Sequence, residues 1–441
     1  MKFVVTGDSL FSSRHLANRL QPELVRHFKE ADAVFTNAEF ITPKRTSYPA
    51  AGRGYITSVD PDTLQEFADL NIQLVNFAHN HTGDFGIEGM LDTLEAAKAH
   101  GLTALGLGRT LDEARKARFF DGKDARIGIV AAGSTRSEVF AASNPGNGVE
   151  GRPGSSPLRW NRAYVLPEAE FNQLKAIDEK LGTAASYREG ARIETFAPMD
   201  PDHFKFGSLF EGSLLIEKGE KAHVRTYANP KDQEALLARI RDAAKRSDFV
   251  LASLHTHEGV NENWYSDEPP EFIEEYAHKA IEAGADAFVG HGAHFTRGVE
   301  IYQGKPIFYN IGSLLMEFEA GESIICPEMY EAYGYGPDAV PSDLHSNRIK
   351  DRDGNFIGFG SERKFSLNFL VDFDIREKGR FSCEILPLDL DTRRDNPLQR
   401  GIPVIGDPKA AREVLERLEA TSKKYGTRFE YDENKGIIRI K

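Results

Sequence analysis

Short apolar strands alternate with amphipathic helices through the first third of the chain, and this alternation is compatible with few folds. Runs such as "KFVVTG", "AVFTNAEF", "IQLVNF" and "ARIGIVAAG" have the length and composition of buried strands. Helices are expected over Pro22 to Lys29, over 60–71, and from Gly86 to Gly101. Buried strands separated by such helices predict an α/β fold around a buried sheet.

From about Ser134 to Asn229 this alternation stops. The stretch "SNPGNGVEGRPGSSPLRWNR" is rich in Gly, Pro, Ser and Arg, so we expect a long loop there. The alternation returns with helices in "KDQEALLARIRDAAKRS" and "EFIEEYAHKAIEAG" and with strands in "DFVLASL", "DAFVG" and "PIFYNIG". A second irregular stretch is expected to extend to about Arg363.

The last part of the chain predicts two antiparallel strands, "KFSLNFLVDFDI" and "RFSCEILPLDL", then a helix over Pro408 to Tyr425 and a closing hairpin. We expect a single domain over 1–441. Its expected parts are a core in 1–135 and 245–320, an inserted lid or loop region in 136–244, and a C-terminal extension in 364–441.

Composition excludes several classes of protein. With 40% hydrophobic and 28% charged residues, the chain has an ordinary globular composition. Its net charge of -13 does not favour nucleic acid or an anionic membrane as a partner. The two cysteines, Cys326 and Cys383, are too few for a disulfide framework or a thiolate zinc site. Because neither a signal peptide nor an apolar run of ~18 residues is present, we expect a cytoplasmic protein without a membrane anchor.

Polar side chains follow five of the apolar strands, at the edge where open α/β sheets build their sites. The chain has 13 histidines, and several of them fall at these strand ends rather than at random. The candidate residues at the strand ends are Asp8, Glu39, Asn80, His81, His255, His257, His291 and His294.

Carboxylate, amide and imidazole ligands without a thiolate suit divalent ions such as Mn²⁺, Fe²⁺, Zn²⁺ or Mg²⁺. The set is too large for one tetrahedral site, and it suits two metal ions ~3.5–4 Å apart with a bridging carboxylate. Such a pair activates water and stabilises a developing anion, which is the chemistry of metal-assisted hydrolysis.

The ordered set "GD", "NAE", "AHNH", "SLH" and "GHGAH" resembles the CapA (poly-γ-glutamate capsule biosynthesis) family, within the calcineurin-like metallophosphoesterase superfamily. The resemblance covers roughly 1–135 and 245–320, and includes "AGADAFVGHGAHFTRGVEIYQGKPIFYNIGSLL". It implies a four-layer α/β/β/α sandwich around a metal centre.

The resemblance also implies roles for single residues. Asp8 and His294 would hold one metal ion, and Glu39 would bridge to a second ion. Asn80, His255 and His291 would hold that second ion. His81 would lie beside the substrate as a general acid or as an electrophilic donor.

Three departures from the superfamily pattern concern the first metal site. Leu10 stands where the superfamily has a histidine, so this site loses a ligand, and Glu39 replaces an aspartate. The motif "HTHEG" adds His257, which is expected to act as a further ligand or as a base. We therefore expect the site of Asn80 and His255 to be the tighter one.

Arginines predict an anionic substrate. Arg152 and Arg159 lie in the Gly- and Pro-rich segment, and Arg53 lies in "AAGRGY". A loop with such arginines suits a lid that binds a carboxylate or a phosphate through paired hydrogen bonds.

Three functions stay open at this level. The first is a metal-dependent hydrolase of an anionic peptide-like or phosphoester substrate. The second is a metal-assisted peptide epimerase of the same fold, in which two opposed residues exchange an α-proton. The third is a non-catalytic accessory protein of capsule biosynthesis. No pattern in the sequence specifies an oligomeric state.

Overall fold

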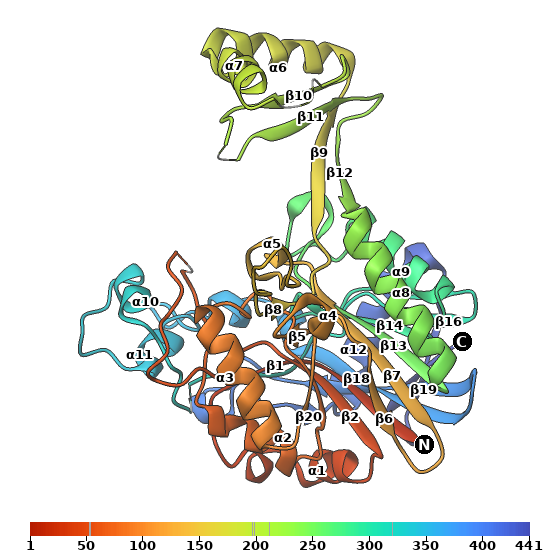
Figure 1. The fold of residues 1–441 in the computed structure, drawn as a ribbon. Coiled ribbons are helices and arrows are strands. Elements are labelled where there is room, and N and C mark those ends of the chain that lie inside the picture. Colours follow the sequence, from red (N-terminus) through yellow and green to blue (C-terminus); the bar gives the residue numbers. More distant parts are fainter. Residues whose placement is uncertain (53, 196, 198, 211, 320) are drawn as a thin grey trace.

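Two large β-sheets lie face to face in the computed structural model, which describes all residues except 53, 196, 198, 211 and 320 (Figure 1). The first sheet has ten strands in the order β21-β22-β19-β18-β1-β2-β3-β4, with β17 beside β1 and β20 beside β19. Its strands are β1 (Lys2–Phe11), β2 (Ala33–Ala38), β3 (Leu74–Asn76), β4 (Thr103–Leu105), β17 (Ser313–Glu317), β18 (Leu367–Glu377), β19 (Arg380–Asp389), β20 (Val404–Ile405), β21 (Phe429–Asp432) and β22 (Ile437–Ile440).

The second sheet has six strands in the order β15-β16-β14-β13-β7-β6. Its four central strands run parallel, and His255 on β13 is directly paired with His291 on β14. The strands are β6 (Arg118–Asp121), β7 (Arg126–Gly133), β13 (Phe249–Thr256), β14 (Ala287–Gly292), β15 (Val299–Tyr302) and β16 (Lys305–Phe308).

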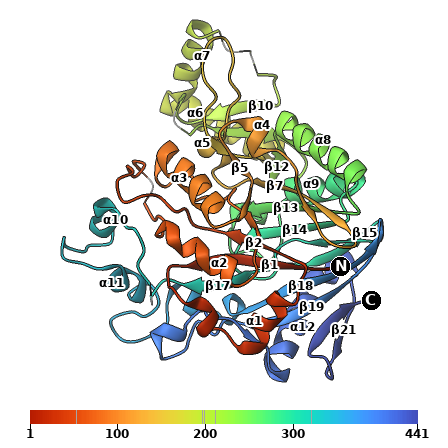
Figure 2. The same ribbon diagram turned by 60° about the horizontal axis from the view of Figure 1, so that its bottom comes forward.

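Helices cover the outer faces of both sheets (Figure 2). Leu24 of α1 (Pro22–Lys29), Phe67 of α2 (Gln65–Asp69) and Met90 of α3 (Gly86–Ala99) pack in one core against the first sheet. Ile240 of α8 (Pro230–Arg246) and Phe272 of α9 (Glu271–Glu282) pack against the second sheet. The helices that the sequence pattern predicted are thus confirmed.

A third core lies between the two sheets. Phe3 and Val5 of β1 point into it and pack with Leu251 and Val289 of the second sheet. The intervening Val4 packs on the helix side, because successive side chains of a strand point to opposite faces. Helix α12 (Pro408–Ser422) adds Val414 and Leu418 to the core between the sheets. The layers are therefore α/β/β/α, as expected, and β18 and β19 pair antiparallel as predicted.

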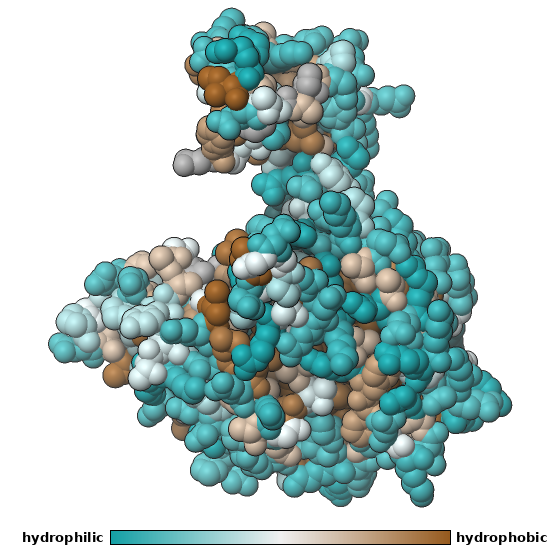
Figure 3. All heavy atoms as spheres, viewed as in Figure 1, coloured by the Kyte–Doolittle hydropathy of each residue, from teal (hydrophilic) through white to brown (hydrophobic). Residues whose placement is uncertain are grey.

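The segment that was expected to be a long loop is instead partly folded. It forms a small four-stranded sheet, ordered β10-β11-β9-β12, with two helices on it. This subdomain projects from the main body on β9 and β12 (Figures 1 and 3). Its elements are β9 (Trp160–Leu166), α6 (Glu168–Leu181), α7 (Thr183–Ile193), β10 (His203–Phe206), β11 (Leu214–Lys218) and β12 (His223–Ala228).

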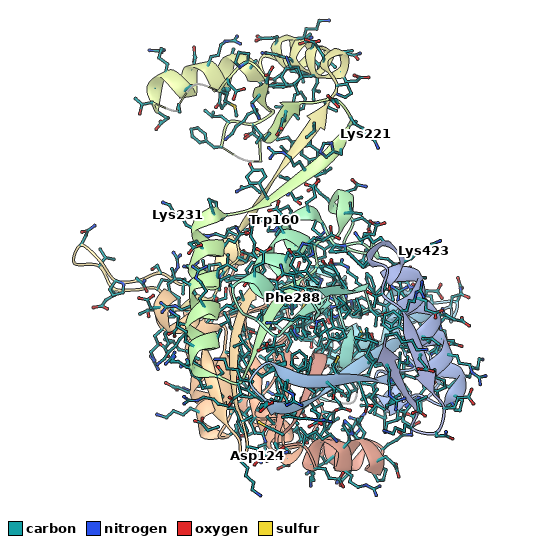
Figure 4. The ribbon with its side chains drawn as sticks, turned by 90° about the vertical axis from the view of Figure 1, so that its right-hand side faces the viewer. Asp124, Trp160, Lys221, Lys231, Phe288 and Lys423 are labelled. Atoms are coloured by element: carbon teal, nitrogen blue, oxygen red, sulfur yellow. The ribbon has the colours of Figure 1, made fainter. Side chains whose placement is uncertain are left out.

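Weak hydrophobic periodicity explains why the sequence pattern missed this subdomain. Helix α6 buries only Phe171 and Asp178, and the strands are mostly half-exposed, so the apolar repeat is faint. Where the two connecting strands leave the main body, the Trp160 ring stacks on Phe272 with centroids 5.1 Å apart (Figure 4).

The second stretch expected to be irregular contains two short helices beside α3 (Figures 1 and 2). Met329 and Leu344 from these helices share a small core with Ile41 and Ile56. Among the described residues, no helix combines the length and the apolar composition that a membrane crossing requires. The remaining α-helices are α4 (Leu111–Ala114), α5 (Ser137–Phe140), α10 (Pro327–Ala332) and α11 (Pro341–Ser346). Short 3-10 helices cover Leu16–Asn18, Pro61–Leu64, Val260–Glu262, Gly358–Gly360, Arg363–Phe365, Pro397–Gln399 and Lys423–Tyr425. Strands β5 (Leu107–Gly108) and β8 (Gly154–Ser155) pair as a separate two-stranded sheet.

Candidate metal centre

Asp8 joins the two sheets at their carboxyl edge. Its carboxylate accepts hydrogen bonds from Asn37 Nδ2 on β2 (2.8 Å) and from the backbone N–H of Gly292 on β14 (2.8 Å). The strand register shifts on both sides of this residue. Gly7 is needed just before it, because a Cβ there would lie 2.1 Å from the carbonyl oxygen of Gly312. A tight backbone approach thus sets the position of the Asp8 carboxylate.

His294 reaches the same place through a strained turn. In "GHGAH", Gly292 has φ 103° and His294 has φ 63°, and few residues other than glycine adopt such positive values. The turn brings His294 Nδ1 to 3.3 Å from Asp8 Oδ2 and to 3.6 Å from Glu39 Oε2.

The two oxygens of Glu39 face different imidazoles. Oε1 lies 3.2 Å from His257 Nε2 and 3.9 Å from His255 Nε2, whereas Oε2 faces His294. Two groups of possible ligand atoms share this carboxylate, each with its atoms within 4.8 Å of one another: Glu39, His257 and His294 in one, and Asp8, Glu39 and His255 in the other. Glu39 is thus common to both groups, as a bridging ligand would have to be.

His291 is the clearest sign that something is to be bound. Its side chain is fully buried, and neither ring nitrogen has a hydrogen-bond partner in the described part of the chain. Buried polar atoms are normally paired, so an imidazole on β14 without a partner could serve as a metal ligand. Burial lowers the pKa of His291 to about 4, which keeps the ring neutral and able to coordinate.

Electrostatics of the centre favours a bound cation. The pKa of Glu39 is raised well above its usual value by burial and then by Asp8 and Asp84. Burial and the neighbouring imidazoles hold the pKa values of His255 and His257 well below the usual value. Among the described residues, no lysine or arginine forms an ion pair with Asp8 or Glu39. Neutral imidazoles and uncompensated carboxylates are compatible with a divalent metal site.

The grouping differs in part from the one that the resemblance implied. Asn80 Oδ1 lies 2.9 Å from His255 Nε2, so these two expected ligands do lie together. His257, by contrast, lies with Glu39 and His294, and Leu10 lines the same cavity. His255 also approaches Asp8, with Nδ1 3.8 Å from Oδ1.

His81 lies beside these groups and is held by Asp84, a residue that the sequence analysis did not single out. Asp84 Oδ2 lies 2.7 Å from His81 Nδ1 and accepts the backbone N–H of Thr57 at 2.8 Å. An ionised carboxylate only accepts hydrogen bonds, so this pairing favours the tautomer of His81 that carries its proton on Nδ1. The spacing of three residues between His81 and Asp84 was the available signal.

A cavity of about 790 Å³ opens above the centre. Glu39, Asn80, His81, His257 and His294 all line it. Aromatic side chains and three arginines form its other walls; they include Tyr55, Trp264, Tyr333, Phe359, Arg136, Arg348 and Arg400. None of these wall residues was predicted from the sequence, because no motif marks them.

Two of the three arginines that the sequence suggested lie away from the cavity. Neither Arg152 nor Arg159 lines the cavity. Arg159 forms a two-point contact with Asp232 at the start of α8 (2.6 and 2.8 Å), and Arg152 donates to the carbonyl oxygen of Ala141 (3.0 Å). Arg159 therefore ties this segment to α8, and Arg152 makes a contact within the segment. Arg53 lies outside the described residues.

Comparison with known proteins agrees with the motifs. A family model described as bacterial capsule synthesis protein PGA_cap matches residues 2–317. The chain belongs to this family. Among its relatives, the uncharacterized protein y4sH of Sinorhizobium fredii is 27% identical over 99% of this chain and 92% of its own length. PGA biosynthesis protein CapA of Bacillus subtilis is 23% identical over 72% of this chain and 63% of its own length.

Among solved structures, a novel phosphatase from Mycoplasma pneumoniae aligns with a TM-score of 0.37 and 12% identity, over 93% of this chain and 96% of that one. In this PGA_cap member, the matched segment ends at Glu317. The matched part therefore supplies the candidate metal ligands, and later residues such as Tyr333 and Arg348 supply much of the remaining cavity wall.

Proposed function

We propose that this protein is a metal-dependent hydrolase of an anionic peptide-like or phosphoester substrate. One observation carries the proposal: the two oxygens of Glu39 face different imidazoles at the base of a cavity large enough for a small substrate. A carboxylate shared between two ligand groups is the arrangement that a two-metal centre needs.

The residues that would hold the ions are Asp8, Glu39, Asn80, His255, His257, His291 and His294. Divalent ions bound there would activate water as a nucleophile and would stabilise the negative charge that develops on the substrate.

His81 has the geometry of a proton donor to the leaving group. Asp84 fixes its ring through Nδ1, and His81 lines the same cavity as Glu39. A histidine oriented in this way, once its ring is also protonated on Nε2, can donate that second proton to the leaving group when the bond breaks. This role agrees with the one expected from the resemblance.

Two features support an anionic substrate. Arg136 and Arg348 line the cavity, and Arg136 contributes to the lowered pKa of His257. The names of the relatives refer to PGA and polyglutamine synthesis, which makes a glutamyl peptide the first substrate to test. A phosphoester is the second.

The test is to load the purified protein with Mn²⁺, Zn²⁺, Fe²⁺ or Mg²⁺ and to incubate it in D₂O with γ-glutamyl peptides and, separately, with phosphoesters. New amines or released phosphate, lost on His81→Ala, are expected. Deuterium in an uncleaved peptide would point to epimerisation instead. A metal-loaded protein that converts none of these substrates would contradict an enzymatic role.

A further inference from the structure

The cavity wall beyond the family match carries an arginine, Arg348, that forms no ion pair with any carboxylate of the described residues. Arg348 follows α11 and is half-buried. Among the described residues, no aspartate or glutamate lies within ion-pair distance of its guanidinium. Arg400, in the same cavity, is different, because it forms a buried ion pair with Glu319 at 3.0 Å. Arg348 is therefore a cavity arginine whose charge is available to a ligand.

The guanidinium of Arg348 is held in place by an aromatic ring. Its Cζ atom lies 3.6 Å from the ring centroid of Tyr55. The ring of Tyr333 lies 6.0 Å from the same guanidinium. Stacking of this kind fixes the plane of an arginine without using its charge, so less entropy is lost when an anion binds.

Tyr55 is itself fixed from the opposite end. Its hydroxyl lies 3.3 Å from His345 Nδ1, and His345 Nε2 lies 3.1 Å from Ser323 Oγ. His345 also stacks on Phe318, with centroids 5.1 Å apart. Burial raises the pKa of Tyr55 and lowers that of His345 to about 4, so both rings are neutral at pH 7. The platform under Arg348 is thus a network of neutral hydrogen bonds.

This platform lies next to the reactive side of the cavity. The ring centroid of Tyr55 is 6.3 Å from that of His81. A single aromatic ring therefore separates the Arg348 guanidinium from the histidine that we place at the leaving group. A substrate whose reacting bond lies at His81 can extend along Tyr55 to Arg348.

We propose that Arg348, stacked on Tyr55, binds an oxyanion of the substrate, a carboxylate or a phosphate, at a position separate from the reacting bond. The term substrate rests on the proposed function, but the binding itself requires neither turnover nor metal. The preferred substrates are then molecules with a second anionic group beyond the bond that reacts. Because Arg348 lies outside the matched segment, this group is a determinant of specificity for this chain.

Calorimetric titration with glutarate and with inorganic phosphate tests the proposal, using the protein as purified and after treatment with EDTA. Arg348→Met should weaken binding of the better probe by about 10–100-fold, as expected for a lost charged hydrogen-bond pair. Arg348→Lys should retain part of the affinity, because the charge stays but the planar group is lost. Arg376→Met is the matched control, since Arg376 is an exposed arginine of β18.

Stronger binding of glutarate identifies a carboxylate site, and stronger binding of phosphate identifies a phosphate site. The proposal is overturned if Arg348→Met binds both probes as tightly as the wild type, if Arg376→Met weakens binding equally, or if neither probe binds the wild type. Anion binding without any turnover would leave this site intact and would count against the hydrolase alone.

Discussion

Glu39→Gln is the substitution that most directly tests the metal centre. The change keeps the size of the side chain and removes its charge. In the metal-free protein, burial, Asp8 and Asp84 all disfavour the ionised form of Glu39. Each unit by which such a pKa is raised corresponds to about 1.4 kcal/mol. Glu39→Gln should therefore leave the metal-free protein at least as stable as the wild type.

With metal present, the variant should behave in the opposite way. Mutation of a residue that only supports a metal ligand typically lowers the metal affinity by about 10–100-fold. Glu39 belongs to both ligand groups, so we expect a loss of at least about 100-fold. At a metal concentration 100 times its Kd, binding stabilises the wild type by about 2.7 kcal/mol. At that concentration, a variant that binds 100-fold more weakly retains only about 0.4 kcal/mol.

The assay is thermal unfolding with and without excess metal, together with elemental analysis of the purified proteins. The wild type should gain a few degrees in Tm on metal addition, and Glu39→Gln should gain almost nothing. Glu258→Gln is a suitable control. Glu258 is also buried, but its carboxylate accepts hydrogen bonds from Ser134, Thr135 and Thr256 and belongs to neither ligand group.

Glu258→Gln should lower stability and keep the metal content of the wild type. The reasoning about Glu39 fails if Glu39→Gln retains full metal content and the full metal-dependent rise in Tm. It fails as well if the metal-free variant is clearly less stable than the metal-free wild type, since Glu39 would then stabilise the fold as an ordinary buried carboxylate.

Three further predictions concern neighbouring residues. His81→Ala should lower kcat by about 10²–10⁴-fold and leave the metal content unchanged, whereas Asn80→Ala should lower both kcat and the metal content. Equal loss of metal in the two variants would contradict this division of roles. Arg297→Met should lower the free energy of unfolding, measured by denaturant titration, by about 3 kcal/mol or more, because this fully buried guanidinium donates to four backbone carbonyls around His257. An unchanged midpoint of unfolding would refute this. As the pH falls through 6.5, the unfolded chain binds a proton that His345, with a pKa of about 4, does not. Stability should therefore fall by about 1.6 kcal/mol between pH 6.5 and pH 5 relative to His345→Gln; parallel pH profiles would exclude this.

Much of the candidate centre could be predicted from the chain order of its strands. In a layered α/β fold, strands rich in apolar residues must be buried, and their carboxyl ends meet at common edges. Asp8, Glu39, His255 and His291 could be singled out for this reason. The role of Asp84 was less visible, because an aspartate three residues after a histidine is common in turns.

Contacts between distant segments could not be predicted in the same way. Arg159 looked suited to a substrate loop, but its partner Asp232 lies 73 residues away in the sequence. Arg348 carried no motif at all, and only its stacking on Tyr55 in the cavity marks it as a ligand-binding side chain. Arginines form ion pairs and ligand contacts with equal ease, so composition cannot separate the two roles.

By itself, the sequence determined the layers of the fold, the strand ends that carry ligand-type side chains, and the family to which the chain belongs. These properties depend on local periodicity and on the order of short motifs, which a linear chain contains. Only the tertiary structure decided how the candidate ligands separate into two groups, with His257 beside Glu39 and His294 in one of them. It also decided which arginines face the cavity. The reason is that side-chain partners 30 to 300 residues apart are selected by packing and desolvation, and these arise when the sheets close on each other.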